Sequence, residues 1–286
     1  NMQAKFAGTI ALVMIAGICG CGRFPMKKTS EAKIISARTG QTISFETMIS
    51  ELSEVSVIYV GEHHTNPAHH AAQLRVIREM AQKFPDLAVG MEMFAVPYQP
   101  ILDDWRAGKT DEASFLRKTH WYANWRFDYG LYRDILNFIQ KSHIHLAALN
   151  IPFHIPPKIS VGGLDSLSED EKKYLPEKID LQNPEHRAYV AEIFKHHSIP
   201  GRDSFEDFYA AQCVWEDVMA ESVVKNLKNR MIVLAGNGHI FRKFGIPDRA
   251  FRRNRASFRT VYMVPNEKSN TDAGDYLWVI PGISHK

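Results

Sequence analysis

The sequence is poor in cysteine and has only one long apolar run, which lies near its N-terminus. Three of the 286 residues are cysteines, namely Cys19, Cys21 and Cys213. Because Cys213 stands alone outside the N-terminal segment, no intrachain disulfide can stabilise the folded part, which must depend on its apolar core. No second apolar stretch is long enough to cross a bilayer.

An excess of charge of one sign is also missing. The formal net charge is +3 at pH 7, so the sequence predicts no strongly basic face and no nucleic-acid partner. The chain contains no internal repeat, no nucleophile elbow, no Cys-x-x-Cys pair and no His-Glu-x-x-His motif. Residues 236–239 lack the lysine and the longer glycine spacing of a phosphate-binding loop.

The apolar run has the pattern of a bacterial lipoprotein signal peptide. Lys5 is the only charged residue among the first twenty, and the apolar residues 6–18 that follow are too few to span a membrane. The run ends in Ile18, Cys19, Gly20 and Cys21, which is the pattern that signal peptidase II requires. We therefore expect cleavage before Cys21 and lipid on its thiol. The alternatives are an ordinary secretory signal or an uncleaved anchor.

Removal of a signal peptide at residues 1–20 leaves about 266 residues, by the subtraction 286 minus 20. We expect residues 21–37 to form a lipidated tether and residues 38–286 to form a single domain. Acyl chains contribute roughly 0.8 kcal/mol per buried CH2, so lipid on this terminus would anchor the protein firmly at a membrane. Gly22 in place of aspartate favours the outer membrane if the host has two membranes.

Strands and helices alternate along the rest of the chain. Short β-branched runs predict strands at residues 55–60, 87–91, 144–149 and 231–235, with edge strands at 261–264 and 277–280. Helical spacing predicts helices at residues 67–84, 131–142 and 205–228. This order predicts an α/β fold with a mostly parallel sheet flanked by helices. Residues 101–130 and 156–200 do not fit the alternation, and we expect them to form a smaller helical cap over one end of the sheet.

Polar residues follow the best predicted strands. Glu62 with His64, Glu92, Asn150, and His239 each come at the end of an apolar run. Ligands of open parallel sheets bind outside the carboxyl ends of the strands, so these side chains are expected to share one crevice. Any one of them alone is more often a helix cap or a solvated loop residue. The coincidence of four strand ends favours a functional site.

Two kinds of chemistry fit a crevice built from Glu62, His64, Glu92 and His239. Carboxylate and imidazole ligands suit zinc, manganese or iron, and a metal-bound water could attack an ester or amide. Two carboxylates and a histidine can also act as acid and base without a metal. Glycines at positions 61, 236 and 238 would allow the close backbone approach of a binding rim.

The stretch 101–130 is dense in aromatic residues. They are Trp105, Phe115, Trp121, Tyr122, Trp125, Phe127 and Tyr129. Such rings form the core under a helical cap, or they offer a flat apolar face to a planar ligand such as a porphyrin, whose iron tyrosinate or histidine can bind. We expect five further histidines to be structural or surface residues: His69 and His70 at the start of the first helix, and His143, His145 and His154 beside the third strand.

Five sequence blocks occur in order over roughly residues 50–250. They lie at residues 61–70 (GEHHTNPAHH), 90–94 with 99–100 (GMEMF, QP), 150–152 (NIP), 208–220 (FYAAQCVWEDVMA) and 236–239 (GNGH). In these blocks the chain resembles the ChaN-like proteins, which are haem-binding, iron-regulated lipoproteins in a superfamily with Tiki proteases and erythromycin esterases. The lipoprotein signal agrees with this resemblance.

The resemblance implies haem bound at a homodimer interface with a tyrosine as iron ligand. Tyr209, in the fourth block, is the first choice for that ligand, with Tyr122 and Tyr129 as alternatives. His196 or His197 would then contact the haem propionates. Enzymes of the superfamily use the Glu/His set at the strand ends, which corresponds here to Glu62, His64, Glu92 and His239.

We therefore expect a haem-binding lipoprotein of iron acquisition, dimeric when loaded, with an outer-membrane haem receptor as a further partner. The alternative is a metal-dependent peptidase or esterase that uses the strand-end crevice and a divalent metal. A third, weaker hypothesis is a structural lipoprotein that retains the crevice without using it.

Overall fold

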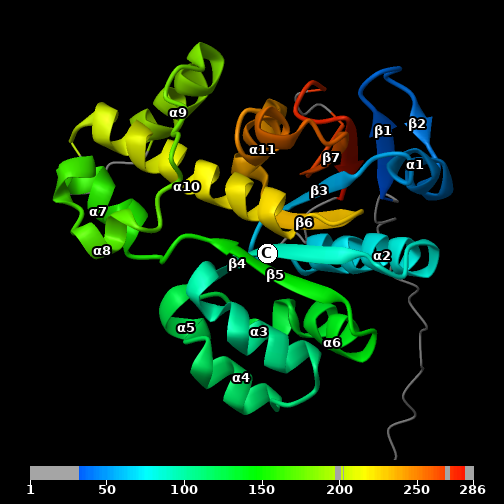
Figure 1. Cartoon of the computed structure of the whole chain (residues 1–286). Helices are drawn as coiled ribbons and strands as arrows, with labels where there is room; N and C mark the ends of the chain where they lie inside the picture. The colour runs from blue at the N-terminus through cyan, green and yellow to red at the C-terminus, as the bar shows by residue number, and fades with distance from the viewer. Residues whose placement is uncertain (1–31, 197–200, 202, 268–270, 281–286) are drawn as a thin grey trace, which may run out of the picture. The chain divides into compact units, whose positions relative to one another are not determined.

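The fold was analysed in a computed structural model, which describes residues 32–196, 201, 203–267 and 271–280 (Figure 1). The predicted signal peptide, Cys21 and His197 lie outside the described residues. The described residues belong to one compact unit. None of the helices in these ranges is both long and apolar enough to cross a membrane.

The described part of the chain contains an eight-stranded sheet with the order β2-β1-β8-β7-β3-β6-β4-β5. Its strands are β1 (Lys33–Ser36), β2 (Thr42–Ile43), β3 (Val57–Glu62), β4 (Ala88–Ala95), β5 (His145–Asn150), β6 (Met231–Gly236), β7 (Phe258–Val264) and β8 (Tyr276–Val279). The six strands from β8 to β5 are parallel, and β1 and β2 pair antiparallel at one edge. The predicted α/β fold with a mostly parallel sheet is thus confirmed.

Helices cover both faces of the sheet (Figure 1). Successive residues of a strand point to opposite faces, so Ile58 and Val60 of β3 pack toward α1 (Phe45–Leu52), α2 (Pro67–Lys83) and α6 (Arg133–Lys141). Val57 and Tyr59 pack on the other side toward α10 (Phe205–Asn226) and α11 (Ile246–Asn254). Both faces are buried, which explains why the central strands have continuous apolar sequences.

Two helical stretches interrupt the alternation. Residues 96–131 form η1 (Val96–Tyr98), α3 (Gln99–Arg106), α4 (Glu112–Lys118), α5 (Trp121–Asn124) and η2 (Tyr129–Leu131). Residues 155–196 form α7 (Ile155–Gly162), η3 (Leu164–Ser166), α8 (Glu169–Lys172) and α9 (Pro184–His196). The remaining short helices, η4 (Asn237–His239) and η5 (Phe241–Lys243), follow β6.

The two antiparallel edge strands were not expected. The tether was predicted to extend to residue 37, but Lys33–Ser36 form β1, which pairs with β8 residue by residue. This boundary was wrong because a four-residue edge strand carries too little apolar periodicity to be told from a linker. β4 is also longer than predicted. It continues through Glu92 to Ala95 with an irregular register between Met91 and Ala95, so Glu92 lies within the strand.

Candidate functional site

The carboxyl ends of three neighbouring strands bring the predicted polar residues together. The strands β3, β6 and β4 are adjacent in the sheet. The His64 Nδ1 atom lies 2.8 Å from Glu62 Oε1, and His239 Nε2 lies 3.4 Å from Glu92 Oε1. A Cβ atom on Gly236 would lie 2.9 Å from the His64 ring and 3.6 Å from Glu92 Oε2. These four side chains therefore form one cluster, which we call the strand-end crevice.

Glu62 is the most heavily hydrogen-bonded member of this crevice. Its Oε1 atom also accepts from the Tyr132 hydroxyl at 2.5 Å and lies 3.4 Å from His70 Nε2, while Oε2 accepts from Gln73 at 2.9 Å. Burial alone would raise the pKa of Glu62, but the contacts with His64 and His70 outweigh it and lower the pKa to about 2. Glu62 is thus an ionised anchor that orients His64.

His239 lies between two carboxylates. Its Nε2 atom faces Glu92, and its Nδ1 atom lies 3.3 Å from Glu216 Oε1. Burial opposes a charge on the ring, but Glu92 and Glu216 more than offset it and raise the pKa of His239 to about 10. The pKa of Glu92 is lowered for the matching reason, and the Gly236 amide also donates to its Oε2 atom at 2.6 Å. The ring is therefore an imidazolium at neutral pH.

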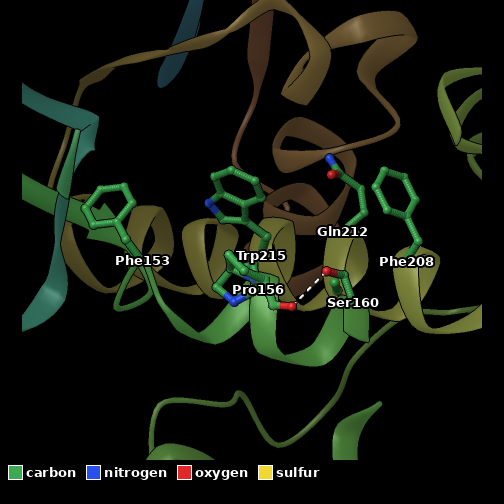
Figure 2. A pocket seen from close by; sticks show the side chains of 8 residues that line it. Phe153, Pro156, Ser160, Phe208, Gln212 and Trp215 are labelled. Carbon is green, nitrogen blue, oxygen red and sulfur yellow. Dashed lines mark hydrogen bonds between the residues drawn. The ribbon is translucent and has the colours of Figure 1, made fainter. Parts of the chain in front are cut away.

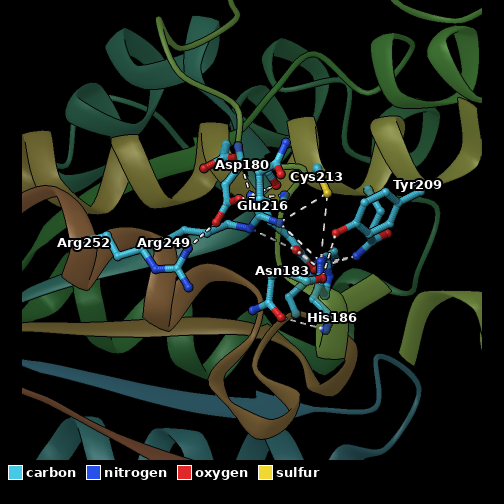
Figure 3. Close-up of polar contacts among 12 residues, drawn as sticks. Asp180, Asn183, His186, Tyr209, Cys213, Glu216, Arg249 and Arg252 are labelled. Atoms are coloured by element: carbon cyan, nitrogen blue, oxygen red, sulfur yellow. Dashed lines mark hydrogen bonds and ion pairs between the residues drawn. The ribbon is translucent and has the colours of Figure 1, made fainter. Parts of the chain in front are cut away.

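Glu216 joins the crevice to a buried polar network between α9, α10 and α11 (Figure 3). Its Oε2 atom lies 3.0 Å from His186 Nε2 and 3.4 Å from Arg249 Nε. Arg249 also pairs with Asp217 and donates to the Cys213 sulfur at 3.3 Å. Sequence reasoning assigned no role to Glu216, although it stands in the fourth block of the resemblance.

Two of the three glycines expected at the rim do permit close approach. A Cβ atom on Gly61 would lie 2.1 Å from the Asn237 side-chain oxygen, and one on Gly236 would lie 2.9 Å from the His64 ring. Around Gly238 the nearest atom is the Tyr189 hydroxyl at 3.7 Å, which is an ordinary contact. Asn237 itself bonds both backbone groups of Met263, so it ties the loop after β6 to β7.

The strand-end crevice is covered by aromatic side chains, which we call its roof: Trp125, Phe127 and Trp215. The His64 ring packs against Trp125 and Phe127 with centroid distances of 4.7 and 5.0 Å. On the other side, Trp215 packs edge-on against His239 at 4.9 Å, and its indole donates to Asn150. Of the residues expected at strand ends, Asn150 thus supports the roof, because its amide in turn donates to the Glu92 carbonyl oxygen at 2.7 Å.

An apolar pocket of about 110 Å³ adjoins this roof (Figure 2). It lies between α7 and α10, and Figure 2 shows the Phe153 ring at one end, the Phe208 ring at the other and the Trp215 ring between them. Its lining residues are Phe153, Pro156, Pro157, Ser160, Phe208, Ala211, Gln212 and Trp215. Gln212 belongs to both regions, because its amide donates to Glu216 at 2.7 Å and lies 3.3 Å from His239 Nδ1.

A second pocket, of about 300 Å³, shares the Phe153 wall. Its other lining residues are Ala95, Pro97, Tyr98, Asn124, Pro152, His154 and Tyr174. Sequence reasoning gave Tyr174 no role, because it stands in no motif or periodic pattern. His154 was expected to be structural or at the surface; it is exposed, and its Nε2 atom lies 3.1 Å from Glu171.

The predicted haem tyrosines occupy different environments. Tyr209 is only 1% exposed, and its hydroxyl donates to the Asn183 carbonyl at 3.3 Å. Burial raises the pKa of Tyr209, and the same cause raises that of Tyr129, also 1% exposed. This placement argues against either phenol as an iron ligand. Tyr122 on α5 is 59% exposed, and His196 at the end of α9 is also exposed.

The other histidines that were expected to be structural include two beside the crevice. His69 Nδ1 accepts from the His63 amide at 2.9 Å, and His70 contacts Glu62 and packs against Tyr132. Within the described ranges, no group of three or more histidine, cysteine, aspartate or glutamate side chains is arranged to hold a metal ion. The structure therefore gives the divalent-metal alternative no support.

The fold and the site define a class: a parallel α/β protein with a carboxylate–imidazole crevice at its strand ends and helical insertions above it. Within that class, the chain belongs to the family described as haem-binding uptake, Tiki superfamily, ChaN, whose pattern matches residues 48–250. The predicted family resemblance is confirmed. No curated protein matches the sequence.

One solved structure agrees with this assignment at the level of the fold. The structure of ChaN of Campylobacter jejuni, described as showing cofacial haem binding, is 21% identical with a TM-score of 0.72, and the match covers 88% of this chain and 98% of that one. An erythromycin esterase mutant in its open conformation is 13% identical with a TM-score of 0.47, over 88% of this chain and 83% of the esterase.

Proposed function

We propose that this protein binds haem for uptake and that the haem lies against the apolar surface formed by the two pockets that share Phe153. The family supports haem as the ligand. The observation that carries the location is the aromatic and proline-rich lining of the pocket between α7 and α10. A porphyrin is a large apolar plane, and its burial against such a surface is favourable.

The first pocket is too small for a porphyrin alone. Sites for ligands of that size usually enclose about 300–1,000 Å³, whereas this pocket holds about 110 Å³. The ligand must therefore extend past Phe153 to the second pocket, where Tyr98, His154 and Tyr174 lie. Tyr174 is 37% exposed, so its hydroxyl group is available to a ligand outside the protein. We propose Tyr174 as the iron ligand, in place of Tyr209.

A haem titration followed by absorbance tests this proposal. Replacing Tyr174 with phenylalanine should weaken haem binding by about tenfold or more, equivalent to about 1.4 kcal/mol, because a phenolate–iron bond is lost. Tyr122→Phe is the matched control, since Tyr122 is exposed but lines neither pocket. If only Tyr122→Phe lost affinity for haem, the iron ligand would be Tyr122 on α5 instead of Tyr174. A protein without a saturable Soret band would contradict haem binding itself.

The wider role is part of the same proposal. A lipid on Cys21 would hold the protein at a membrane, preferably the outer one, where an outer-membrane haem receptor could supply its cargo. We further propose that haem loading produces a homodimer, because a porphyrin seated on an open surface leaves one face for a second copy. Exposed Tyr174, which lines the second pocket, favours such a contact. Sizing chromatography with and without haem measures this step.

A hydrolase is the second candidate, and the strand-end crevice favours it. Protonated His239 and ionised Glu92 form an acid and base pair at 3.4 Å, and Glu62 holds the more accessible His64 in a fixed orientation. This arrangement suits metal-free acid–base attack on an ester or peptide. Hydrolysis that is lost in His239→Gln while haem binding persists would support this function beside haem binding.

A further inference from the structure

We infer that haem, bound as proposed above, closes the strand-end crevice, so that the haem-loaded and crevice-accessible states exclude one another. This inference rests on the proposed haem site. It links the proposed haem surface with the strand-end crevice, which were considered separately above.

Contacts through Phe153 carry the inference on one side. Phe153 lines both pockets. Its ring packs against Trp125 with a centroid distance of 6.0 Å, and Trp125 packs against His64 at 4.7 Å. A planar ligand that spans the two pockets must cross Phe153 and therefore cover this edge of the roof.

Contacts through α10 carry it on the other side. Trp215 and Gln212 line the apolar pocket, and both also touch His239, the first through its ring and the second through its amide. The side chains of Trp215 and Gln212 therefore lie between the proposed haem surface and His239 of the strand-end crevice. Haem bound on this surface would be separated from the buried pair of His239 and Glu92 by the thickness of one side chain.

His64 is the group whose accessibility should change. Its side chain is 28% exposed, whereas those of His239 and His70 are 10% and 3% exposed. His64 Nδ1 is held by Glu62, and the Cε1 and Nε2 atoms of the ring lie close to the Gly236 backbone, so a reagent can reach the ring only over its remaining exposed surface. The rate at which a small reagent modifies this imidazole therefore reports whether the crevice is open.

Carbethoxylation of the full-length protein, followed by peptide mass spectrometry, tests the inference. The reaction is run at mildly alkaline pH with and without haem, and haem saturation is read from the Soret band of the same sample. With haem ten times above its dissociation constant, modification of His64 should slow about tenfold if only the free protein reacts. The exposed His143, which lines neither pocket, serves as the internal control.

A second variant separates covering from direct ligation. If haem only covers the crevice, His64→Gln binds haem with the same Soret position and the same affinity. A changed Soret band in this variant would mean that His64 ligates iron, which overturns the inference. Unchanged His64 modification in a sample with a saturated Soret band also overturns it and leaves haem binding intact. A sample that never shows a Soret band contradicts the proposed function instead.

Discussion

At the scale of single residues, the geometry of the strand-end crevice depends on Gly61, which has no side chain. Gly61 lies against the Asn237 amide, which fixes the loop that carries His239. Gly61→Ala should lower the free energy of unfolding by about 1–3 kcal/mol, because the added methyl displaces Asn237 from buried hydrogen bonds. Gly238→Ala is the control, since its methyl has room. Urea denaturation of both variants measures the difference, and equal losses would contradict the argument.

The residue scale also shows how far the sequence could predict the site. Glu62, His64, Glu92 and His239 were predictable, because the carboxyl ends of parallel strands must meet along one edge of a sheet. Glu216 was not, since it lies in the middle of a helix 23 residues before His239. Only the packing of α10 across the strand ends brings its carboxylate to the ring, and no local pattern encodes that packing.

At the scale of elements, buried Arg249 connects α11 to α10. Arg249→Met should destabilise the protein by about 3 kcal/mol, because buried Glu216 and Asp217 would both lose the cation that they share, and only the histidine contacts of Glu216 and the Arg253 contact of Asp217 would remain. Arg252 on the same helix pairs with Asp180 at the surface and is 52% exposed, so Arg252→Met should cost at most about 1 kcal/mol. Chemical denaturation compares the two. Similar losses would mean that the network adds little to the packing of α11.

The same scale shows which elements were predictable. The strands β3, β4, β5 and β6 and the long helices were found within a few residues, because a buried strand has a continuous apolar run and an amphipathic helix has a strong period. The edge strands β1 and β2 were missed, since two to four residues cannot display one. The burial of Tyr209 could not be predicted for a related reason. Helical spacing puts Tyr209 on α10, but only the packing of α9 decides that this face is buried.

At the scale of the whole molecule, stability should depend on pH through the crevice. The pKa of His239 is raised from 6.5 to about 10, so its stabilising contribution is complete below about pH 6.5 and is lost as pH rises toward 10. The pKa of Glu62 is lowered from 4.5 to about 2, so its contribution is complete above about pH 4.5 and is lost as pH falls toward 2. These two groups together favour maximal stability between about pH 4.5 and 6.5.

The alkaline side of this profile is the sharper test. Between pH 6.5 and 10 the unfolded chain releases the His239 proton while the folded protein keeps it, so the free energy of unfolding should fall by up to about 1.4 kcal/mol per pH unit. Urea denaturation at several pH values measures this slope. His239→Gln should flatten it, because the titrating group is gone. A steep slope that persists in this variant would assign the linkage to other groups and remove the evidence for a protonated histidine between Glu92 and Glu216.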